Sequence, residues 1–305
     1  MAYVYAHGSG TEESPFEVWT AEDLAGVSDH LDAHFIQKAN IDLDGIEWEP
    51  IGEDFTGVYD GAGFLIENLT IDDEETGVIG LFKKSSGELV GIHLENVYLV
   101  GASEVGGIVG VSTGSITNCS VSGFLKGEWT VGGVASWNEG AIKRCCADVT
   151  IESGMGVAGG LVGTHENGGL IEKCYSKGTV TATDSWNYSN GGLVGSTGQE
   201  TDDPIIDSYS LADVTGVEFN GGLVGMTYSN VTRCYSTGVV TASSDSGGLI
   251  GIIAGGGVVE NSYYNSDTSG MSDTDKGTPK TTAEMKNPAT YDGWDFETIW
   301  AIDTE

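Results

Sequence analysis

Tryptophan and tyrosine residues set among small polar residues are the positions of this sequence best suited to recognising a ligand. Trp129, Trp137, Trp186 and Tyr188 stand in the segments GEWT, SWNEG and SWNYSNGG, which we expect to form exposed turns between strands. An exposed indole or phenol ring can stack on a sugar or anchor a protein contact, because it joins a large apolar face to a polar edge. We therefore predict that these four residues bind a ligand; the alternative is that they only cover corners of the fold.

Residues for catalysis are few. Arg144 and Arg233 are the two arginines of the chain, so the basic residue that a polysaccharide lyase needs is poorly provided for, and no GxSxG nucleophile motif occurs. His30 and His34 have a spacing that metal ligands use on a helix, but no glutamate of an HExxH motif lies between them. We predict no catalytic residues, no metal ligands and no cofactor, with a carbohydrate-active β-helix enzyme as a less favoured alternative.

The chain is strongly acidic, with 46 acidic against 12 basic residues and a formal net charge of −34. Such a surface repels phosphates and anionic lipids, so we expect neither nucleic acid nor a membrane as a partner. Acidic clusters at residues 72–75, 202–203 and 267–275 carry the oxygen ligands that Ca²⁺ prefers, which leaves bound Ca²⁺ open. The first twenty residues have neither the basic nor the apolar segment of a signal peptide, so we expect no export signal in this sequence.

A glycine-pair motif recurs along the chain. The second glycines of the pairs are Gly107, Gly133, Gly160, Gly192, Gly222 and Gly248. By subtraction they lie 26–32 residues apart, a period that indicates one supersecondary unit stacking on its neighbours to bury its apolar face. Each unit holds short apolar, β-branched segments separated by Gly, Asn, Ser and Asp, which is typical of strands and turns.

A second motif follows each glycine pair, with the form Ile-x-x-Cys-Tyr-Ser around Cys174. Its cysteine position holds Cys, Ser or Ile in each unit: Ile92, Cys119, Cys145, Cys174, Ser208, Cys234 and Ser262. We expect this position to point inward and to form a structural core column, in which cysteine serves as a small apolar residue. That role accounts for the five cysteines, an odd number, without any disulfide.

The whole pattern predicts an all-β protein, a right-handed parallel β-helix (β-solenoid) of about eight coils with N- and C-terminal caps. Coils stacked about 4.8 Å apart would make a rod roughly 40 Å long. A β-propeller is disfavoured because its blades need about 40–50 residues, and leucine-rich repeats need a different leucine pattern. We place an N-terminal cap with a short helix at 1–50, the solenoid at 51–264 and a C-terminal cap at 265–305.

Both ends carry their own signals. Thr20 and Asp23 form an N-cap pair that predicts a helix over Ala21–Leu31. Near the C-terminus we expect a one-turn helix, a turn, and a closing strand. The aromatic residues of that strand, Trp294 and Trp300 among them, are expected to cover the last coil.

The glycine-pair motif resembles the GLUG motif, named for its Gly-Leu-apolar-Gly core. Three segments carry the match: 160–163, 192–195 and 222–225. Flanking runs at 41–71 and 281–303 are also similar to regions found around such repeats, whereas one coil departs from the motif with Ala135-Ser136. The resemblance implies a β-solenoid of the kind found in bacterial and archaeal surface proteins, adhesin-like passengers, IgA-specific peptidases and virus tail or spike proteins.

These expectations favour a non-enzymatic structural or adhesive protein. We place it first in the virion, as a tail-spike, fibre or capsid-decorating protein that binds a host-surface glycan or protein, because a self-capped rod without an export signal suits assembly inside a cell. A secreted or cell-surface adhesin is the alternative. Expected partners are other virion or surface proteins and a glycan receptor, and self-association into a homo-oligomer stays open.

Overall fold

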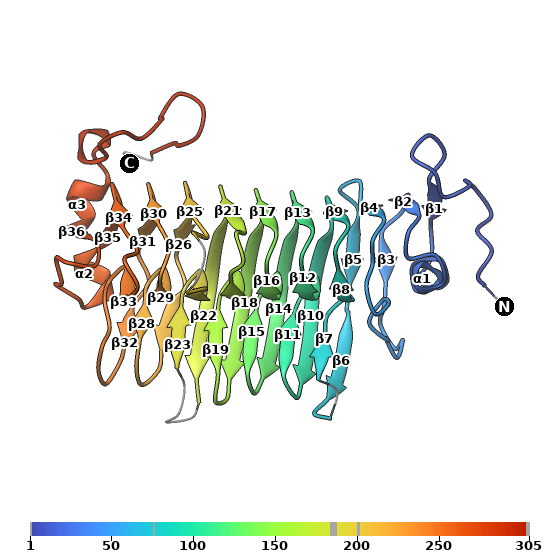
Figure 1. Ribbon diagram of the computed structural model, residues 1–305, viewed down its shortest axis with the longest axis horizontal. Helices are drawn as coiled ribbons and strands as arrows, with labels where there is room; N and C mark the ends of the chain where they lie inside the picture. Colours follow the sequence, from blue (N-terminus) through green and yellow to red (C-terminus); the bar gives the residue numbers. More distant parts are fainter. Residues whose placement is uncertain (1, 76, 184–187, 200–201, 303–305) are drawn as a thin grey trace.

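The computed structural model describes residues 2–75, 77–183, 188–199 and 202–302. It confirms the predicted all-β solenoid, in which parallel strands wind into about eight turns along one axis (Figure 1). Within these residues, each coil of the repeat region contributes to four sheets, and its strands pair in parallel with their equivalents in the neighbouring coils. Ile116, for example, lies opposite Leu89 of the preceding coil and Ile142 of the following one.

Two sheets carry the segments around the core column. The strands of the first sheet follow one another along the rod: β1 (Phe16–Val18), β2 (His34–Gln37), β4 (Val58–Asp60), β9 (Glu88–Val90), β13 (Ser115–Thr117), β17 (Ala141–Lys143), β21 (Leu170–Glu172), β25 (Ile205–Ile206), β30 (Val231–Thr232) and β34 (Val259–Glu260). The second sheet contains β3 (Ile41–Asp42), β5 (Leu65–Glu67), β6 (Thr70–Asp73), β10 (His93–Gly101), β14 (Ser120–Gly127), β18 (Cys146–Ser153), β22 (Tyr175–Ala182), β26 (Tyr209–Ser210), β27 (Asp213–Thr215), β31 (Tyr235–Ser236), β32 (Val240–Thr241), β35 (Tyr263–Asn265) and β36 (Thr278–Lys280).

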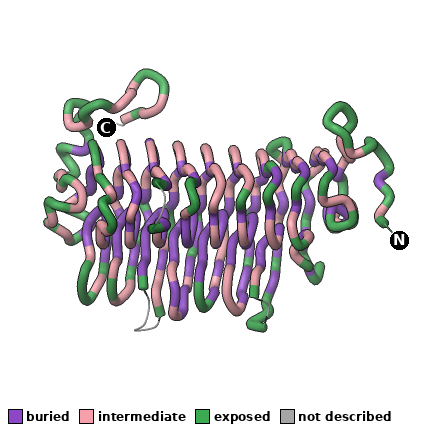
Figure 2. The backbone as a smooth tube through the Cα atoms, in the orientation of Figure 1, coloured by how far each residue is buried: buried purple, intermediate pink, exposed green. Residues whose placement is uncertain are grey.

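The other two sheets flank the glycine pairs. The third sheet contains β7 (Val78–Ile79), β11 (Glu104–Gly106), β15 (Thr130–Gly132), β19 (Val157–Gly159), β23 (Ser189–Gly191) and β28 (Asn220–Gly221). The fourth sheet contains β8 (Phe82–Ser85), β12 (Val109–Ser112), β16 (Ala135–Asn138), β20 (Val162–His165), β24 (Val194–Thr197), β29 (Val224–Thr227) and β33 (Ile250–Ile253). Figure 2 shows burial running through the coils along the whole rod, with exposed residues at its two ends and in turns along its lower edge.

Close packing between coils explains the recurring glycines. A Cβ on Gly160 would lie 2.1 Å from the carbonyl oxygen of Gly192 in the next coil, a distance that no side chain tolerates. A Cβ on Gly195 would lie 2.4 Å from Cγ1 of Val157 in the preceding coil. Leu193, between the glycines, is fully buried. The motif therefore combines a turn without side chains and a residue that fills the core.

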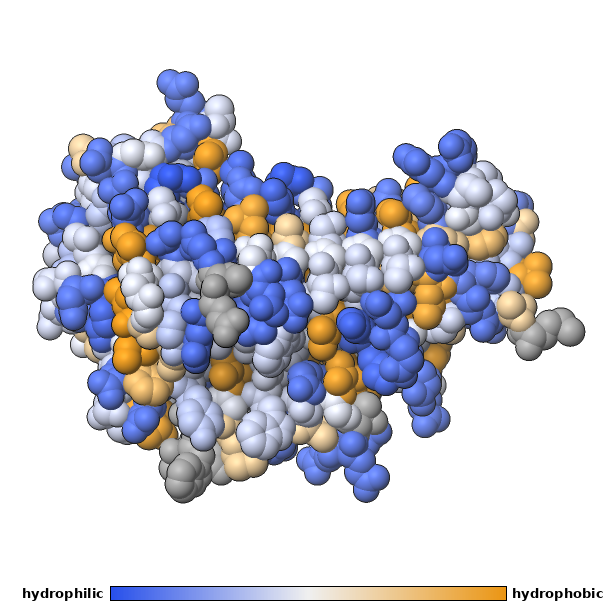
Figure 3. All heavy atoms as spheres, in the orientation of Figure 1, coloured by the Kyte–Doolittle hydropathy of each residue, from blue (hydrophilic) through white to orange (hydrophobic). Residues whose placement is uncertain are grey.

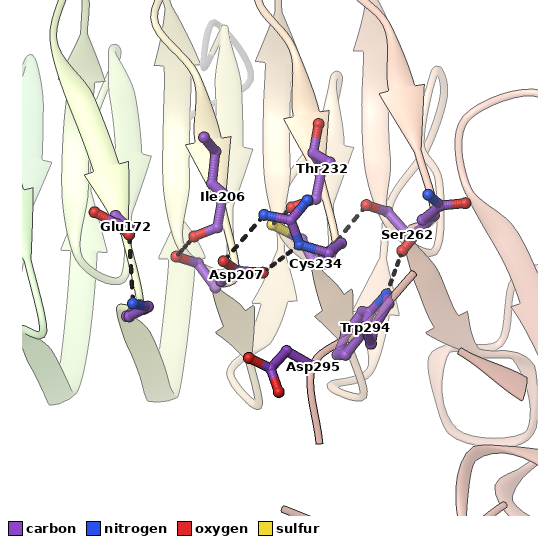
Figure 4. Close-up of polar contacts among 12 residues, drawn as sticks. Glu172, Ile206, Asp207, Thr232, Cys234, Ser262, Trp294 and Asp295 are labelled. Carbon is purple, nitrogen blue, oxygen red and sulfur yellow. Dashed lines mark hydrogen bonds and ion pairs between the residues drawn. The ribbon is translucent and has the colours of Figure 1, made fainter. Parts of the chain in front are cut away.

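The residues predicted to form the core column lie buried in the structure. Its side chains are at most 2% exposed: Ile92, Cys119, Cys145, Cys174, Ser208, Cys234 and Ser262. The column is also a hydrogen-bond ladder. The sequence predicts only an apolar role for its cysteines. The backbone N–H of Cys119 donates to Sγ of Cys145 and that of Cys145 to Sγ of Cys174, both at 3.4 Å. The N–H of Cys234 donates to the Ser262 hydroxyl at 3.0 Å (Figure 4).

The column side chains donate as well as accept. Sγ of Cys174 donates to the carbonyl oxygens of Ile142 (3.5 Å) and Glu172 (3.3 Å). The Ser262 hydroxyl likewise donates to the carbonyl oxygens of Val231 (3.4 Å) and Glu260 (2.8 Å). Thiol and hydroxyl each provide one donor and an acceptor, which explains why serine can stand in a position otherwise held by cysteine.

An outward row of rings follows the column on the second sheet. We call Tyr175, Tyr209, Tyr235 and Tyr263, which lie in register on β22, β26, β31 and β35, the tyrosine row. The rings of Tyr175 and Tyr209 have centroids 5.0 Å apart and planes 6° apart, and those of Tyr209 and Tyr235 are 4.8 Å and 2° apart. Cys146 holds the same position one coil earlier.

At the N-terminal end, the predicted capping pair is confirmed but the helix is shorter than expected. The backbone N–H of Asp23 donates to Oγ1 of Thr20 (3.1 Å), and the Asp23 carboxylate accepts from the Thr20 N–H (3.0 Å). The helix α1 (Ala21–Gly26) ends at a glycine, a poor helix former, and a 3₁₀ turn, η1 (Val27–Asp29), follows. In this region β1 pairs with β2, and β2 pairs with β4 of the solenoid. The boundary at residue 50 stays a prediction.

The C-terminal end has short helices but not the predicted closing strand. The helical segments are α2 (Ser266–Ser269), α3 (Thr282–Met285) and η2 (Pro288–Thr290). In the described residues after η2, up to residue 302, no strand forms. The aromatic residues of this tail contact the last coil at Asn261 and Tyr263 and reach back from there along the tyrosine row. Trp294 donates from Nε1 to the carbonyl oxygen of Asn261 (2.8 Å; Figure 4), and the Trp300 ring lies 5.8 Å from that of Tyr235.

Candidate recognition groove

A groove crosses the fourth sheet on the outside of the solenoid. In register across β16, β20, β24 and β29 lie Trp137, Thr164, Ser196 and Met226, which we call the groove row. Two small side chains thus lie between two large ones, and a hollow opens over the two middle coils. Its volume is about 550 Å³, within the range of ligand-binding pockets.

A second set of residues deepens the groove where these strands end. Glu166, Gly198 and Tyr228 each follow the last residue of their strand. Gly198 lies between the other two and has no side chain, and a Cβ there would lie 2.4 Å from Cβ of Glu166. The floor therefore stays low between a carboxylate on one side and a phenol ring on the other.

Neighbouring side chains support both walls of the groove. The Trp137 side chain lies beside the Glu166 carboxylate and lowers its pKa. On the opposite wall, the backbone N–H of Tyr228 donates to Oγ1 of Thr197 (2.9 Å). The Thr197 hydroxyl is itself buried and lies 3.3 Å from the Thr227 hydroxyl. Both aromatic residues are half-buried, so their positions are largely fixed before any ligand arrives.

The electrostatics of the groove come from one carboxylate. Glu166 is the charged residue among the described residues that line it. Burial raises the pKa of Glu166 above its ordinary value, and the nearby carboxylates of Glu139 and Asp203 raise it further. The adjacent Trp137 side chain and a hydrogen bond from Asn167 (3.1 Å) lower this pKa, in the opposite direction. The site is therefore mildly acidic, and its other polar groups are uncharged hydroxyls and amides.

A buried histidine lies directly behind the groove. His165 is the last residue of β20 and points into the core, where it is fully buried. Its Nδ1 lies 2.9 Å from the side-chain nitrogen of Asn138, and its Nε2 has no hydrogen-bond partner among the residues that the structure describes. Burial lowers the pKa of His165 to about 4, so the imidazole is neutral at physiological pH.

The structure separates the four aromatic residues predicted to bind a ligand. Trp137 lines the groove, but it lies within β16 and not in a turn as expected, because the turn of its coil begins only after Asn138. Trp129 is 50% exposed in the bend between β14 and β15, and Tyr188 is 57% exposed just before β23. Trp186 lies outside the described residues. A binding role for the four stays a prediction.

The remaining groove residues escaped the search for exposed aromatic turns. Thr164, Ser196 and Met226 directly follow the fourth residue of the glycine motif, as Trp137 does. Aligning the repeats on the glycines places these four residues in one row, and the change from large to small and back is the signal that could have revealed the hollow. Tyr228 follows two residues later in the same alignment.

Two further expectations concern metals and membranes. Across the described parts of the chain, no three His, Cys, Asp or Glu side chains come together so that they could hold a metal ion. The Nε2 atom of His30 lies 2.7 Å from the carbonyl oxygen of Tyr3. None of the helices in the described ranges has the length and apolar character needed to cross a membrane.

Comparison with known proteins gives both a motif and relatives. The GLUG motif family matches residues 101–123 and 156–181. An Evansella cellulosilytica protein described as "Putative Gly-rich membrane protein" is 32% identical over an alignment of 394 positions that covers 99% of this chain and 45% of that protein. Halomucin of Haloquadratum walsbyi is 34% identical over 207 residues, covering 52% of this chain and 2% of halomucin. The chain thus spans less than half the length of these relatives.

Solved structures share the fold at low sequence identity. A crystal structure described as "a putative immunoglobulin A1 protease from Bacteroides ovatus" has a TM-score of 0.73 and 22% identity, with 94% of each chain covered. An IgA1 protease structure has a TM-score of 0.65 and 18% identity, and the match covers 94% of this chain and 25% of that one. The chain is therefore a β-solenoid repeat protein that carries the GLUG motif.

Proposed function

We propose that this chain is a non-enzymatic, adhesive segment displayed at a cell surface. The observation that carries the proposal is the groove: a solvent-open hollow on the side of a rigid rod, walled by Trp137 and Tyr228 and floored by hydroxyl groups. Such a site suits holding a ligand, because its aromatic and polar groups are already fixed in place. Stacked coils in turn present the groove on a stiff support.

The names of the relatives support a surface location over the virion that the sequence favoured first. One relative is described as a membrane protein and another as halomucin. The descriptions of these relatives do not mention a virus particle. Figure 3 shows that hydrophilic side chains cover much of one face of the rod, with apolar ones scattered between them, which suits exposure to water.

A non-enzymatic role is supported by the groove chemistry. Glu166 is its charged residue among the described lining residues, and one Asp203 carboxylate oxygen accepts the backbone N–H groups of Gly168 (2.6 Å) and Gly169 (3.1 Å). A glycosidase uses two carboxyl groups flanking the scissile bond, and here the second carboxylate is engaged in holding a turn. The structures described as IgA1 protease share the fold of this chain at 22% and 18% identity.

Two measurements test this function. Antibodies raised against the purified chain should label intact cells of the source organism without permeabilisation; labelling only of permeabilised cells or of virus particles would overturn the surface location. The purified chain should release no product from a panel of polysaccharides and should leave human IgA1 uncleaved. Product release or IgA1 cleavage would overturn the non-enzymatic role.

A further inference from the structure

We propose that the groove binds an uncharged oligosaccharide laid along the solenoid axis, between Trp137 and Tyr228. The inference rests on the adhesive role proposed above and names the ligand class of that same site. The two walls belong to coils that are three steps apart, which places them about 14 Å from each other for strands about 4.8 Å apart. A hollow of that length and of about 550 Å³ accommodates a chain of several sugar rings better than a single one.

The two aromatic walls provide fixed stacking platforms. The indole of Trp137 lies beside the Glu166 carboxylate and is half-buried, which leaves part of its apolar ring available to the C–H groups of a sugar face. Tyr228 is anchored through its backbone by Thr197. Because both aromatic residues are half-buried before binding, less side-chain entropy is lost when a ligand stacks on them than for fully exposed rings.

The floor supplies uncharged hydrogen-bond groups at coil spacing. Thr164 and Ser196 lie opposite each other in adjacent strands, and both line the groove. Asn167 and Gln199 add amide groups at the end of the same two strands. Hydroxyls and amides donate and accept equally, as an array of sugar hydroxyls requires.

Charge selects among the glycans. The described residues that line the groove include no basic side chain, and the whole chain has a net charge of −34. A uronic acid, sulfate or sialic acid would meet Glu166 without a compensating cation and would be repelled. A basic peptide is the alternative occupant that the same carboxylate would attract, and Glu166 therefore distinguishes the two classes.

The test is binding of the purified full chain to a glycan array that contains neutral, anionic and amino-bearing oligosaccharides, with the best neutral ligand then titrated by calorimetry. We expect neutral oligosaccharides to bind and Trp137→Ala to weaken that binding at least about tenfold, the effect of losing a central aromatic contact. Ser196→Trp, which fills the hollow from its floor, should weaken it as much. Trp19→Ala is the matched control and should leave affinity within about twofold, because Trp19 is 47% exposed near the N-terminal end and does not line the groove.

Glu166→Gln decides the charge class. For a neutral ligand the substitution keeps the size of the side chain beside Trp137 and changes affinity by less than about threefold, with little dependence on ionic strength. Affinity for a basic peptide would fall strongly with Glu166→Gln and with salt, and that result would assign the groove to a peptide instead. Melting curves of each variant separate lost binding from lost folding. Glycan binding that survives both Trp137→Ala and Ser196→Trp would reject this site while leaving the adhesive role intact, whereas absence of any neutral glycan among the bound ligands would reject the ligand class.

Discussion

The groove row and the tyrosine row are built on the same repeat and have opposite results. In the tyrosine row, equal residues stand in register, and the rings of Tyr175, Tyr209 and Tyr235 stack on one another at about the spacing of the coils, 5.0 and 4.8 Å. In the groove row, unequal residues stand in register, so threonine and serine leave a space that tryptophan and methionine border. Identical large side chains in a solenoid row pack against one another and leave no hollow between them. A row of large and small side chains leaves a hollow above the small ones.

The C-terminal tail reinforces the contrast. It lies on the tyrosine row, where Trp300 is 6.1 Å from Tyr209 and 5.8 Å from Tyr235 by ring centroids. Stacked rings thus present an apolar strip that the chain covers with its own residues, whereas the groove row is left open to solvent. The first surface contributes to stability and the second is available for recognition.

The largest expected effect concerns the core behind the groove row. The pKa of His165 is lowered from an ordinary 6.5 to about 4 by burial, so below pH 6.5 the unfolded chain binds a proton that the folded chain rejects. Stability should therefore fall by about 3 kcal/mol between pH 6.5 and pH 4 and change no further from this group below it. Chemical denaturation of wild type and His165→Asn across this pH range measures how much of the loss in stability comes from His165. An equal pH dependence of stability in both proteins would contradict the lowered pKa of His165.

The next largest effect is expected when a substitution interrupts the tyrosine row. Tyr209 stacks on both neighbours, so Tyr209→Ala should lower the free energy of unfolding by about 2 kcal/mol, from two lost ring pairs at roughly 1 kcal/mol each. Tyr98→Ala is the control, since Tyr98 is 44% exposed and stacks on Phe124 alone in the same sheet. Urea unfolding curves give both values, and a loss at Tyr98 as large as that at Tyr209 would show that row continuity adds nothing.

A smaller effect is expected when the tyrosine row is extended by one coil. Cys146 lies opposite Tyr175 in the adjacent strand and is half-buried, so Cys146→Tyr should add one ring to the stack. We expect a gain of about 1 kcal/mol in the free energy of unfolding. Cys146→Ala should give no such gain. A destabilised Cys146→Tyr variant with normal folding would mean that neighbouring Lys177 and Asp148, which are paired at 2.8 Å, leave no room for the ring.

The smallest perturbation uses a thiol reagent. It compares the cysteines of the core column with Cys146, which lies in register with the tyrosine row. Burial raises the pKa of the Cys119 and Cys145 thiols, and raises that of Cys234 to about 12. These thiols are protonated and hidden from reagents, whereas Cys146 is partly exposed. In the native state we expect one thiol of the five to react with a bulky reagent, and all five after unfolding. Peptide mass mapping that finds Cys174 labelled in the native protein would contradict the buried ladder.

Much of the fold could be predicted because the repeat makes each interior position visible several times. The seven residues of the column from Ile92 to Ser262 are all buried, and their shared place relative to the glycine pairs is what drew attention to them in the sequence. Its hydrogen-bond ladder was not anticipated, because the sequence does not reveal that Sγ of Cys174 lies within 3.4 Å of the backbone N–H of Cys145. The end of the chain escaped as well: residues with strand-like composition around Trp294 fold onto the side of the rod.

The groove was harder to predict because it depends on what neighbours lack. Trp137 was singled out as an exposed aromatic residue, but it becomes a wall only because Thr164 and Ser196 beside it are small. Tyr228 gave no signal by itself among the 12 tyrosines of the chain. A cavity is a property of several residues in register, and reading each turn separately does not find it.

The pairing of each coil with its immediate neighbours has a mechanical consequence. In the described residues, the strands of each coil pair with those of the coils directly before and after it. A force that pulls the two ends apart therefore acts on a terminal coil before it acts on the interior ones. We expect the rod to peel open one coil at a time, lengthening in steps of one repeat, and to yield gradually under shear where a globular domain would rupture at once.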